Sequence, residues 1–81
     1  MNKKHMPIFD AQEAQKHIAQ SIKIAAQSKR IPQKELAFMI GVSEANLSRY
    51  LSCLRKPDIS VLMNISVALG VSLDSLCFGD I

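Results

Sequence analysis

Three residues, Gly41-Val42-Ser43, separate two segments with helical periodicity, and this short interruption constrains the fold more than any other feature of the chain. Glycine adopts the left-handed conformation that ends a helix, and serine is a favoured N-cap, so one helix ends and the next begins within a few residues. Two helices joined by so short a turn must cross steeply. The sequence therefore predicts two short, steeply crossed helices, at about residues 32–40 and 44–52.

The remaining segments also have helical periodicity, and no run alternates long enough to predict a strand. Asp10 and Glu13 form a capping-box pattern that predicts a helix to about Ser28. Asp58 is the expected cap of a fourth helix that ends at Gly70, and Ser72 is the expected cap of a fifth at residues 73–78. The predicted inward positions of these helices are Ala14, Ile18, Ile22, Ala25, Leu36, Ala37, Ile40, Leu62, Ile65 and Leu69.

The predicted third helix has two unlike sides. On a helical wheel its apolar residues, Leu47, Tyr50, Leu51 and Leu54, cluster on the side expected to face the core. The opposite side is small and polar, with Ala45, Ser48, Arg49 and Ser52 outward and Glu44 and Asn46 on the flanks. A helix with a slim polar face and one arginine fits the major groove of DNA, where arginine can donate to O6 and N7 of guanine.

The domain organisation is simple, because 81 residues can bury only one core. We expect an arm at residues 1–9 and one domain at residues 10–81. No segment is apolar enough to span a bilayer or to act as a secretory signal, so a cytoplasmic protein without a membrane partner is expected. Cys53 and Cys77 have no second ligand at metal spacing, which predicts two reduced thiols, no metal site and no cofactor.

The charge is distributed unevenly along the chain. Residues 1–30 carry a net charge of +4 and residues 31–56 carry +2, whereas residues 57–81 carry −3. Confinement of the basic charge to the first two thirds is expected if that part faces a polyanion, although a solvated basic face would look similar.

Several strings at fixed spacing resemble one known family. They are Gln33-Lys34-Glu35-Leu36-Ala37, Gly41-Val42-Ser43, Leu47-Ser48-Arg49-Tyr50, Arg55-Lys56-Pro57 and the run from Ala68 to Leu76. Together they resemble the phage-repressor helix-turn-helix family, which is lambda-repressor-like and Cro-like. The resemblance implies an all-α, five-helix bundle in which the second and third helices form the helix-turn-helix.

The same resemblance implies roles for individual residues, with double-stranded DNA as the partner. The residues expected at base edges are Ser43, Glu44, Ala45, Asn46, Ser48 and Arg49, and Arg49 is the strongest candidate for direct readout. The residues expected at phosphates are Gln33, Lys34, Ser52, Arg55 and Lys56. For Gln33 this role also has a physical basis, because free N–H groups at a helix N-terminus favour an anion.

Three positions depart from the family pattern. Pro32 stands where the family usually has Ser or Thr, so the second helix is expected to lack a side-chain cap. Cys53 stands where a glycine commonly closes the third helix, which requires either a strained residue or another closure. Leu54 replaces a polar loop residue, and it either packs beneath the first helix or the arm, or joins a partner surface.

The expected function is a transcriptional regulator, a repressor that binds a two-fold operator as a dimer. The antitoxin of a toxin–antitoxin pair, or a protein-binding adaptor on the same fold, remains an alternative, and a toxin or regulator would then be a protein partner. No nucleophile–base pair indicates an enzyme. The predicted dimer interface is the C-terminal segment, with Val71, Leu73, Leu76, Phe78 and Ile81, and the alternative interface contains Met6, Ile8, Phe9 or Leu54.

Overall fold

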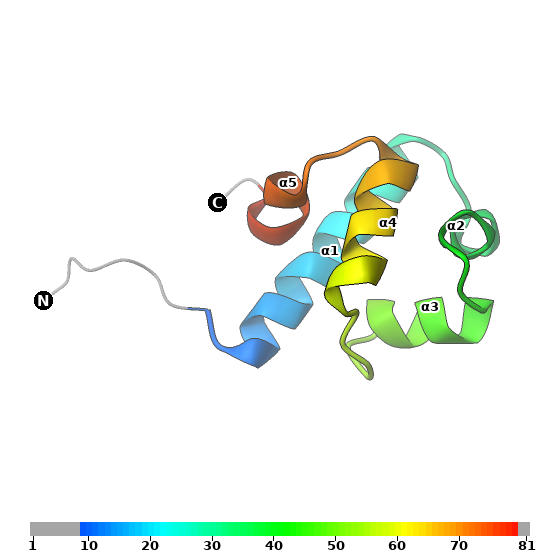
Figure 1. The fold of residues 1–81 in the computed structure, drawn as a ribbon. Helices are drawn as coiled ribbons and strands as arrows, with labels where there is room; N and C mark the ends of the chain where they lie inside the picture. Colours follow the sequence, from blue (N-terminus) through cyan, green and yellow to red (C-terminus); the bar gives the residue numbers. More distant parts are fainter. Residues whose placement is uncertain (1–8, 80–81) are drawn as a thin grey trace, which may run out of the picture.

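A computed structural model of the chain describes residues 9–79, and within them the regular structure is entirely helical. The helices are α1 (Ala11–Ser28), α2 (Gln33–Ile40), α3 (Glu44–Leu51), α4 (Ile59–Leu69) and α5 (Leu73–Phe78) (Figure 1). This confirms the predicted five-helix, all-α fold, although α2 and α3 are each one residue shorter than predicted, at the N-terminal and C-terminal end respectively. Over these residues, no helix combines the length and the apolar character that crossing a bilayer requires.

Local side chains set where the helices begin. The caps predicted from the sequence are all present, namely Asp10 for α1, Ser43 for α3, Asp58 for α4 and Ser72 for α5. Each side-chain oxygen accepts a hydrogen bond from the backbone N–H three residues later, at 2.8 to 3.0 Å. Helix α2 begins after Pro32 without a side-chain cap, as predicted. These contacts satisfy N–H groups that would otherwise have no partner in the first turn.

Left-handed residues end α2, α3 and α4. Gly41 and Gly70 have φ angles of +74° and +66°, and in both cases the next N–H returns to a carbonyl of the last helical turn. Cys53 has φ +64° and closes α3 in the same way, with the Leu54 N–H donating to the Arg49 carbonyl at 2.9 Å. The sequence left strain or another closure open at Cys53, and the structure has the left-handed conformation that is costly for a residue with a Cβ.

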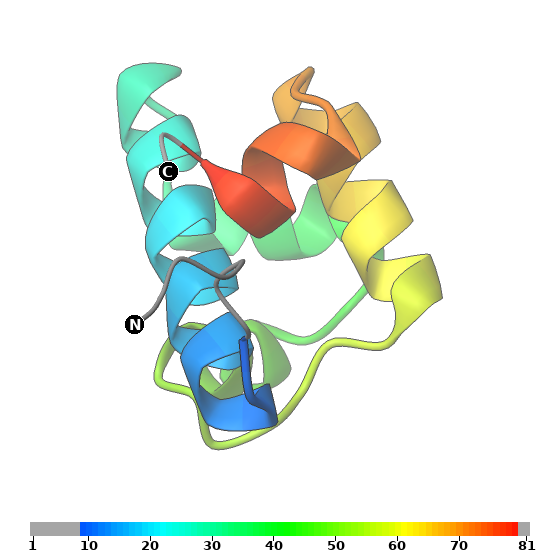
Figure 2. The same cartoon turned by 90° about the vertical axis from the view of Figure 1, so that its left-hand side faces the viewer.

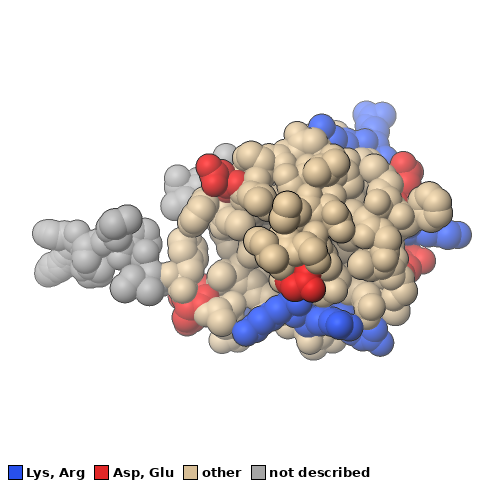
Figure 3. All heavy atoms as spheres, in the orientation of Figure 1, with Lys and Arg blue, Asp and Glu red and all other residues tan. Residues whose placement is uncertain are grey.

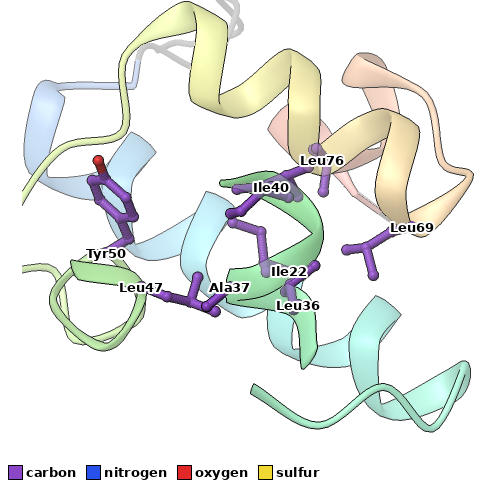
Figure 4. Packing of buried hydrophobic residues seen from close by; sticks show 9 residues of the cluster. Ile22, Leu36, Ala37, Ile40, Leu47, Tyr50, Leu69 and Leu76 are labelled. Atoms are coloured by element: carbon purple, nitrogen blue, oxygen red, sulfur yellow. The ribbon is translucent and has the colours of Figure 1, made fainter. Parts of the chain in front are cut away.

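One hydrophobic core joins all five helices (Figure 4). The buried members of this cluster are Ile22, Leu36, Ala37, Ile40, Leu47, Tyr50, Ile65, Leu69 and Leu76. In α1, Ile22 is buried as predicted, and Ala19, which was not predicted to be buried, is buried as well. Ala14, Ile18 and Ala25, which were also predicted to face inward, are only half-buried.

The predicted core position of Leu54 is wrong. Its side chain is 78% exposed, so it does not pack beneath α1 either. The wheel that placed it inward requires a continuous helix, but α3 ends at Leu51 and the left-handed Cys53 turns the chain away.

The long helix α1 supports the arrangement. Helix α5 packs along α1, while α2 packs against both α3 and α4. Figure 2 shows α5 between α1 and α4, with α1 and α4 on opposite sides of the molecule. Helix α3 is therefore left at one edge, with only its inner side covered.

Candidate nucleic-acid interface

The pair α2–α3 presents one helix to solvent at the edge of the domain (Figure 1). The turn between them is fixed by two hydrogen bonds, from the Gly41 N–H to the Phe38 carbonyl at 3.3 Å and from the Val42 N–H to the Ala37 carbonyl at 3.1 Å. Ser43 then caps α3 through its hydroxyl oxygen. Because these bonds and the Ser43 cap hold both ends of the turn, they restrict the angle of α3 relative to α2.

The exposed side of α3 is the one that the sequence predicted. Leu47 and Tyr50 are buried, so α3 is anchored from within. The candidate base-reading residues lie on the other side, where Ser43, Glu44, Ala45, Ser48 and Arg49 are exposed and Asn46 is half-buried. None of these outward residues is bulky and apolar, so the helix can approach a groove closely.

Asn46 connects the two arginines of the candidate interface. Its Oδ1 accepts a hydrogen bond from Nη1 of Arg49 at 2.9 Å and another from Nη1 of Arg55 at 3.3 Å. The guanidinium carbon of Arg55 also lies 6.0 Å from the centre of the Tyr50 ring, within the range of a cation–π contact. Sequence reasoning assigned Asn46 to DNA alone, and it missed that Asn46 positions Arg49 and Arg55. Only its spacing of three residues from Arg49 on one helix could have indicated the first bond.

The loop after α3 carries the remaining cations of this edge. Arg55 and Lys56 are exposed, and the Arg55 N–H donates to the Arg49 carbonyl at 3.3 Å. Figure 3 shows Lys and Arg atoms along the lower edge of the molecule, where Figure 1 places α3 and this loop. The structure thus brings Asn46, Arg49 and Arg55 together at a basic edge.

Asp58 places one negative charge beside the basic loop. Its carboxylate accepts from the Val61 N–H at 2.9 Å and from the Ser60 hydroxyl at 2.7 Å. The Val61 N–H, the Ser60 hydroxyl and the charge of Arg55 together lower the pKa of Asp58 below its usual value. Asp58 therefore stays ionised at neutral pH and partly offsets the basic charge at this end of α4.

The N-terminus of α2 is the second place predicted to meet phosphate. Gln33 and Lys34 are exposed in its first turn, and Pro32 supplies no side-chain cap for the N–H groups there. Those N–H groups favour an anion. Glu35 is also exposed in this turn, so its carboxylate opposes the approach of a phosphate.

Ser52 is less free than its predicted phosphate contact requires. Its hydroxyl donates to the backbone carbonyl of Ser48. A phosphate oxygen can only accept a hydrogen bond, so Ser52 would have to release Ser48 before donating to it.

The described residues of the predicted C-terminal interface are covered to different degrees. Leu76 is only 1% exposed, which makes that part of the prediction wrong, since the packing of α5 on α1 buries its side chain. Val71 and Leu73 are half-buried and pack against the core. Phe78 is half-exposed and lies edge-on to Phe9, with 6.2 Å between the ring centres.

Some predictions fall on residues beyond those that the structure describes. They are the interface position Ile81, the alternative interface positions Met6 and Ile8, and all but the last residue of the arm predicted at residues 1–9. Within residues 9–79, Cys53 and Cys77 are free thiols, and no cluster of His, Cys, Asp or Glu is arranged to hold a metal ion.

Comparison with known proteins gives concordant matches. The family model described as Helix-turn-helix matches residues 22–76, more than half of the chain. An uncharacterized HTH-type transcriptional regulator of Bacillus subtilis, YqaE, is 32% identical over 62 residues, which are 76% of this chain and 53% of that protein. The chain thus spans about half the length of this relative.

A solved structure has the same architecture. It is the crystal structure of the P22 c2 repressor protein in complex with a synthetic operator, 30% identical in sequence with a TM-score of 0.71. The match covers 78% of this chain and 96% of that one, so nearly all of the repressor chain in that crystal has a counterpart here.

Proposed function

This chain belongs to the helix-turn-helix family of lambda-repressor-like, DNA-binding transcriptional regulators, and on that premise we propose that it represses transcription by binding a two-fold operator as a dimer. The observation that carries the proposal is the basic edge formed by α3 and the following loop, where Asn46 holds Arg49 and Arg55 side by side. The P22 c2 repressor was crystallised on an operator, which supports duplex DNA as the partner of this edge.

The proposed readout uses the exposed side of α3. Arg49 donates to a base edge in the major groove, because it is the one basic side chain on α3, and guanidinium groups fit O6 and N7 of guanine. Ser43, Glu44, Ala45, Asn46 and Ser48 lie along the same side and contact neighbouring bases or the adjoining backbone. The Glu44 carboxylate can accept from N4 of cytosine but repels phosphates, so it selects among sequences.

The proposed phosphate contacts flank α3 on both sides. Arg55 and Lys56 bind the backbone from the loop that follows α3, and Ser52 joins them once its hydroxyl leaves the Ser48 carbonyl. Gln33 and Lys34 bind from the N-terminus of α2, where free N–H groups add their own attraction for an anion. Such contacts fix the register of α3 in the groove without reading sequence.

Selection of bound sites from a random duplex library tests this function. A dimer on a two-fold operator should enrich inverted repeats. The centres of the two half-sites should lie about one helical turn apart, roughly 34–36 Å. An antitoxin would enrich a site as well, but its affinity would change when its toxin is added. Failure to enrich any sequence, with no affinity for duplex at low salt, would favour the protein-binding adaptor instead.

A further inference from the structure

A hollow of about 410 Å³ lies between α1 and α5, and we call it the α1–α5 hollow. Along α1 it extends from His17 to Ser28, eleven positions that correspond to about 16 Å of helix. Ile24, Val71 and Leu76 supply apolar surface to its lining, which otherwise consists of small or polar residues and contains no Lys, Arg, Asp or Glu. Ile24 is a large apolar side chain, yet 57% of it is exposed within residues 9–79. The described part of the chain therefore leaves open a groove that can accept apolar side chains.

The arm reaches one end of this hollow. Phe9, its last residue and the one that the structure describes, lies against His17, with 5.9 Å between the ring centres. The Phe9 ring also lies edge-on to Phe78 at the C-terminal end of α5, with 6.2 Å between the ring centres. Phe9 precedes α1, whereas His17 lies six positions after Ala11, the first residue of the helix, so the side chain of Phe9 points back along α1. The end of the arm is thus already packed where the hollow begins.

The surface around the hollow has the charge opposite to that of the arm. Asp10 before α1 and Asp74 in the first turn of α5 are both exposed. Figure 3 shows Asp and Glu atoms at the left of the described surface, where Figure 1 places α5 and the start of α1. Residues 1–8 contain Lys3 and Lys4 and no Asp or Glu. Opposite charge therefore favours the arm as the occupant of the hollow, and it disfavours the same surface of a second copy.

The arm matches the hollow in length and in the order of its side chains. Met6 lies three residues before Phe9, which is about 10 Å of extended chain. Ile24 lies seven positions after His17, which is also about 10 Å of helix. An extended arm that continues from Phe9 along α1 therefore brings Met6 beside Ile24, and Ile8, two residues from Met6, points to the same side. Because Phe9 holds the arm at the hollow, the arm has a high effective concentration there that no separate molecule has.

We propose that residues 1–8 of this chain bind in the α1–α5 hollow and run antiparallel to α1. Met6 and Ile8 cover the apolar lining. The two lysines of the arm lie near the first turn of α5, where Asp74 is exposed. In Figure 1, α5 is at the upper left and α3 at the lower right, so the bound arm keeps both lysines away from the basic edge. The inference goes beyond the proposed function, because it concerns a contact within one chain that needs no DNA.

Cysteine cross-linking tests the contact directly. In a Cys53→Gly, Cys77→Ser background, Met6→Cys combined with Ile24→Cys should form a disulfide within one chain under mild oxidation. The matched control combines Met6→Cys with Val67→Cys, because Val67 on α4 is also an exposed apolar residue but does not line the hollow. Equal cross-linking in the control would overturn the proposal. A linked dimer of about twice 9.0 kDa would place the arm on a second copy and would overturn it as well.

A double-mutant cycle in urea titration gives the second measurement. Met6→Ala and Ile24→Ala should each raise the equilibrium constant for unfolding at least about threefold, because each removes apolar surface that the bound arm buries. The double variant should lose at least about twofold less than the product of the two single losses, because the two residues contact each other. Met6→Ala combined with Val67→Ala is the control, and its losses should simply multiply. Losses that multiply in both pairs would overturn the contact between arm and hollow.

Salt dependence of duplex binding tests the alternative that the arm lies on DNA. Replacing both Lys3 and Lys4 with alanine should leave the slope of log affinity against log salt unchanged, because the bound arm holds them away from phosphates. A slope lower by about two would place the arm on the duplex and overturn the proposal. The cross-link and the urea titrations need no DNA, so they test the arm contact even if the chain binds no duplex and the proposed function fails.

Discussion

If α3 reads DNA as proposed, we expect Arg49 and Asn46 to make separable contributions to the affinity, and the magnitude of each can be predicted. Replacing Arg49 with alanine removes the one guanidinium on α3, and loss of a good base contact costs about 1–3 kcal/mol. That cost corresponds to roughly a 5- to 140-fold loss of affinity per half-site. It should fall mainly on the preferred operator, so discrimination at one base pair should relax as well.

Asn46 should contribute less, and mainly by positioning Arg49 and Arg55. A guanidinium has five N–H donors, and the 2.9 Å bond to Asn46 Oδ1 uses one of them, so Arg49 keeps donors for a base while its side chain is held. Releasing such a side chain costs about 0.5–1.5 kcal/mol of ordering on binding. Asn46→Ala should therefore weaken the operator about 2- to 12-fold.

A double-mutant cycle measured by fluorescence anisotropy distinguishes positioning from reading. Wild type, Asn46→Ala, Arg49→Ala and the double variant are titrated with the selected operator and with single-base-pair variants of it. If Asn46 acts mainly by positioning Arg49, its substitution should have little effect once Arg49 is alanine. Strictly additive losses would refute the positioning role, and equal weakening of every duplex by Arg49→Ala would refute its role as a base reader.

The other predictions concern Lys56 in the basic loop, Cys53 at the end of α3 and Asp58 at the start of α4. Lys56→Ala should weaken specific and non-specific duplexes alike, and should lower the slope of log affinity against log salt by about one, as titrations at several salt concentrations will show. Cys53→Gly should raise the free energy of unfolding by roughly 0.5–1 kcal/mol in urea titration, because a left-handed residue with a Cβ costs about 1–2 kcal/mol and the greater freedom of unfolded glycine offsets part of it. Ser52→Gly, at φ −96°, is the control and should destabilise instead. The pKa of Asp58 is lowered in the folded state, so its stabilising contribution is present above about pH 4 and is lost as pH falls through the folded pKa. Asp58→Asn should make the thermal midpoint less sensitive to pH between about 5 and 2, and an unchanged pH profile would contradict the cap.

The sequence by itself determined the number of helices and where most of them begin and end. Capping is a local interaction between a side chain and a backbone N–H three residues away, so Asp10, Ser43, Asp58 and Ser72 could be identified without a structure. The side of α3 that faces the core could also be predicted from the sequence. Helical periodicity alone separates the side of Leu47 and Tyr50 from the side of Arg49.

Only the tertiary structure decided the burial and the contacts of residues whose neighbours are distant in sequence or lie beyond a helix end. Leu54 is exposed because the left-handed Cys53 interrupts the periodicity that placed it inward. Leu76 is buried because α1, more than forty residues earlier, lies along α5. The hydrogen bond from Arg55 to Asn46 depends on the path of a loop. The exposure of Phe38 on α2 and of Met63 and Val67 on α4 depends on which helices pack on α2 and α4. Periodicity gives the side of a helix that a residue occupies, whereas packing alone decides what covers that side.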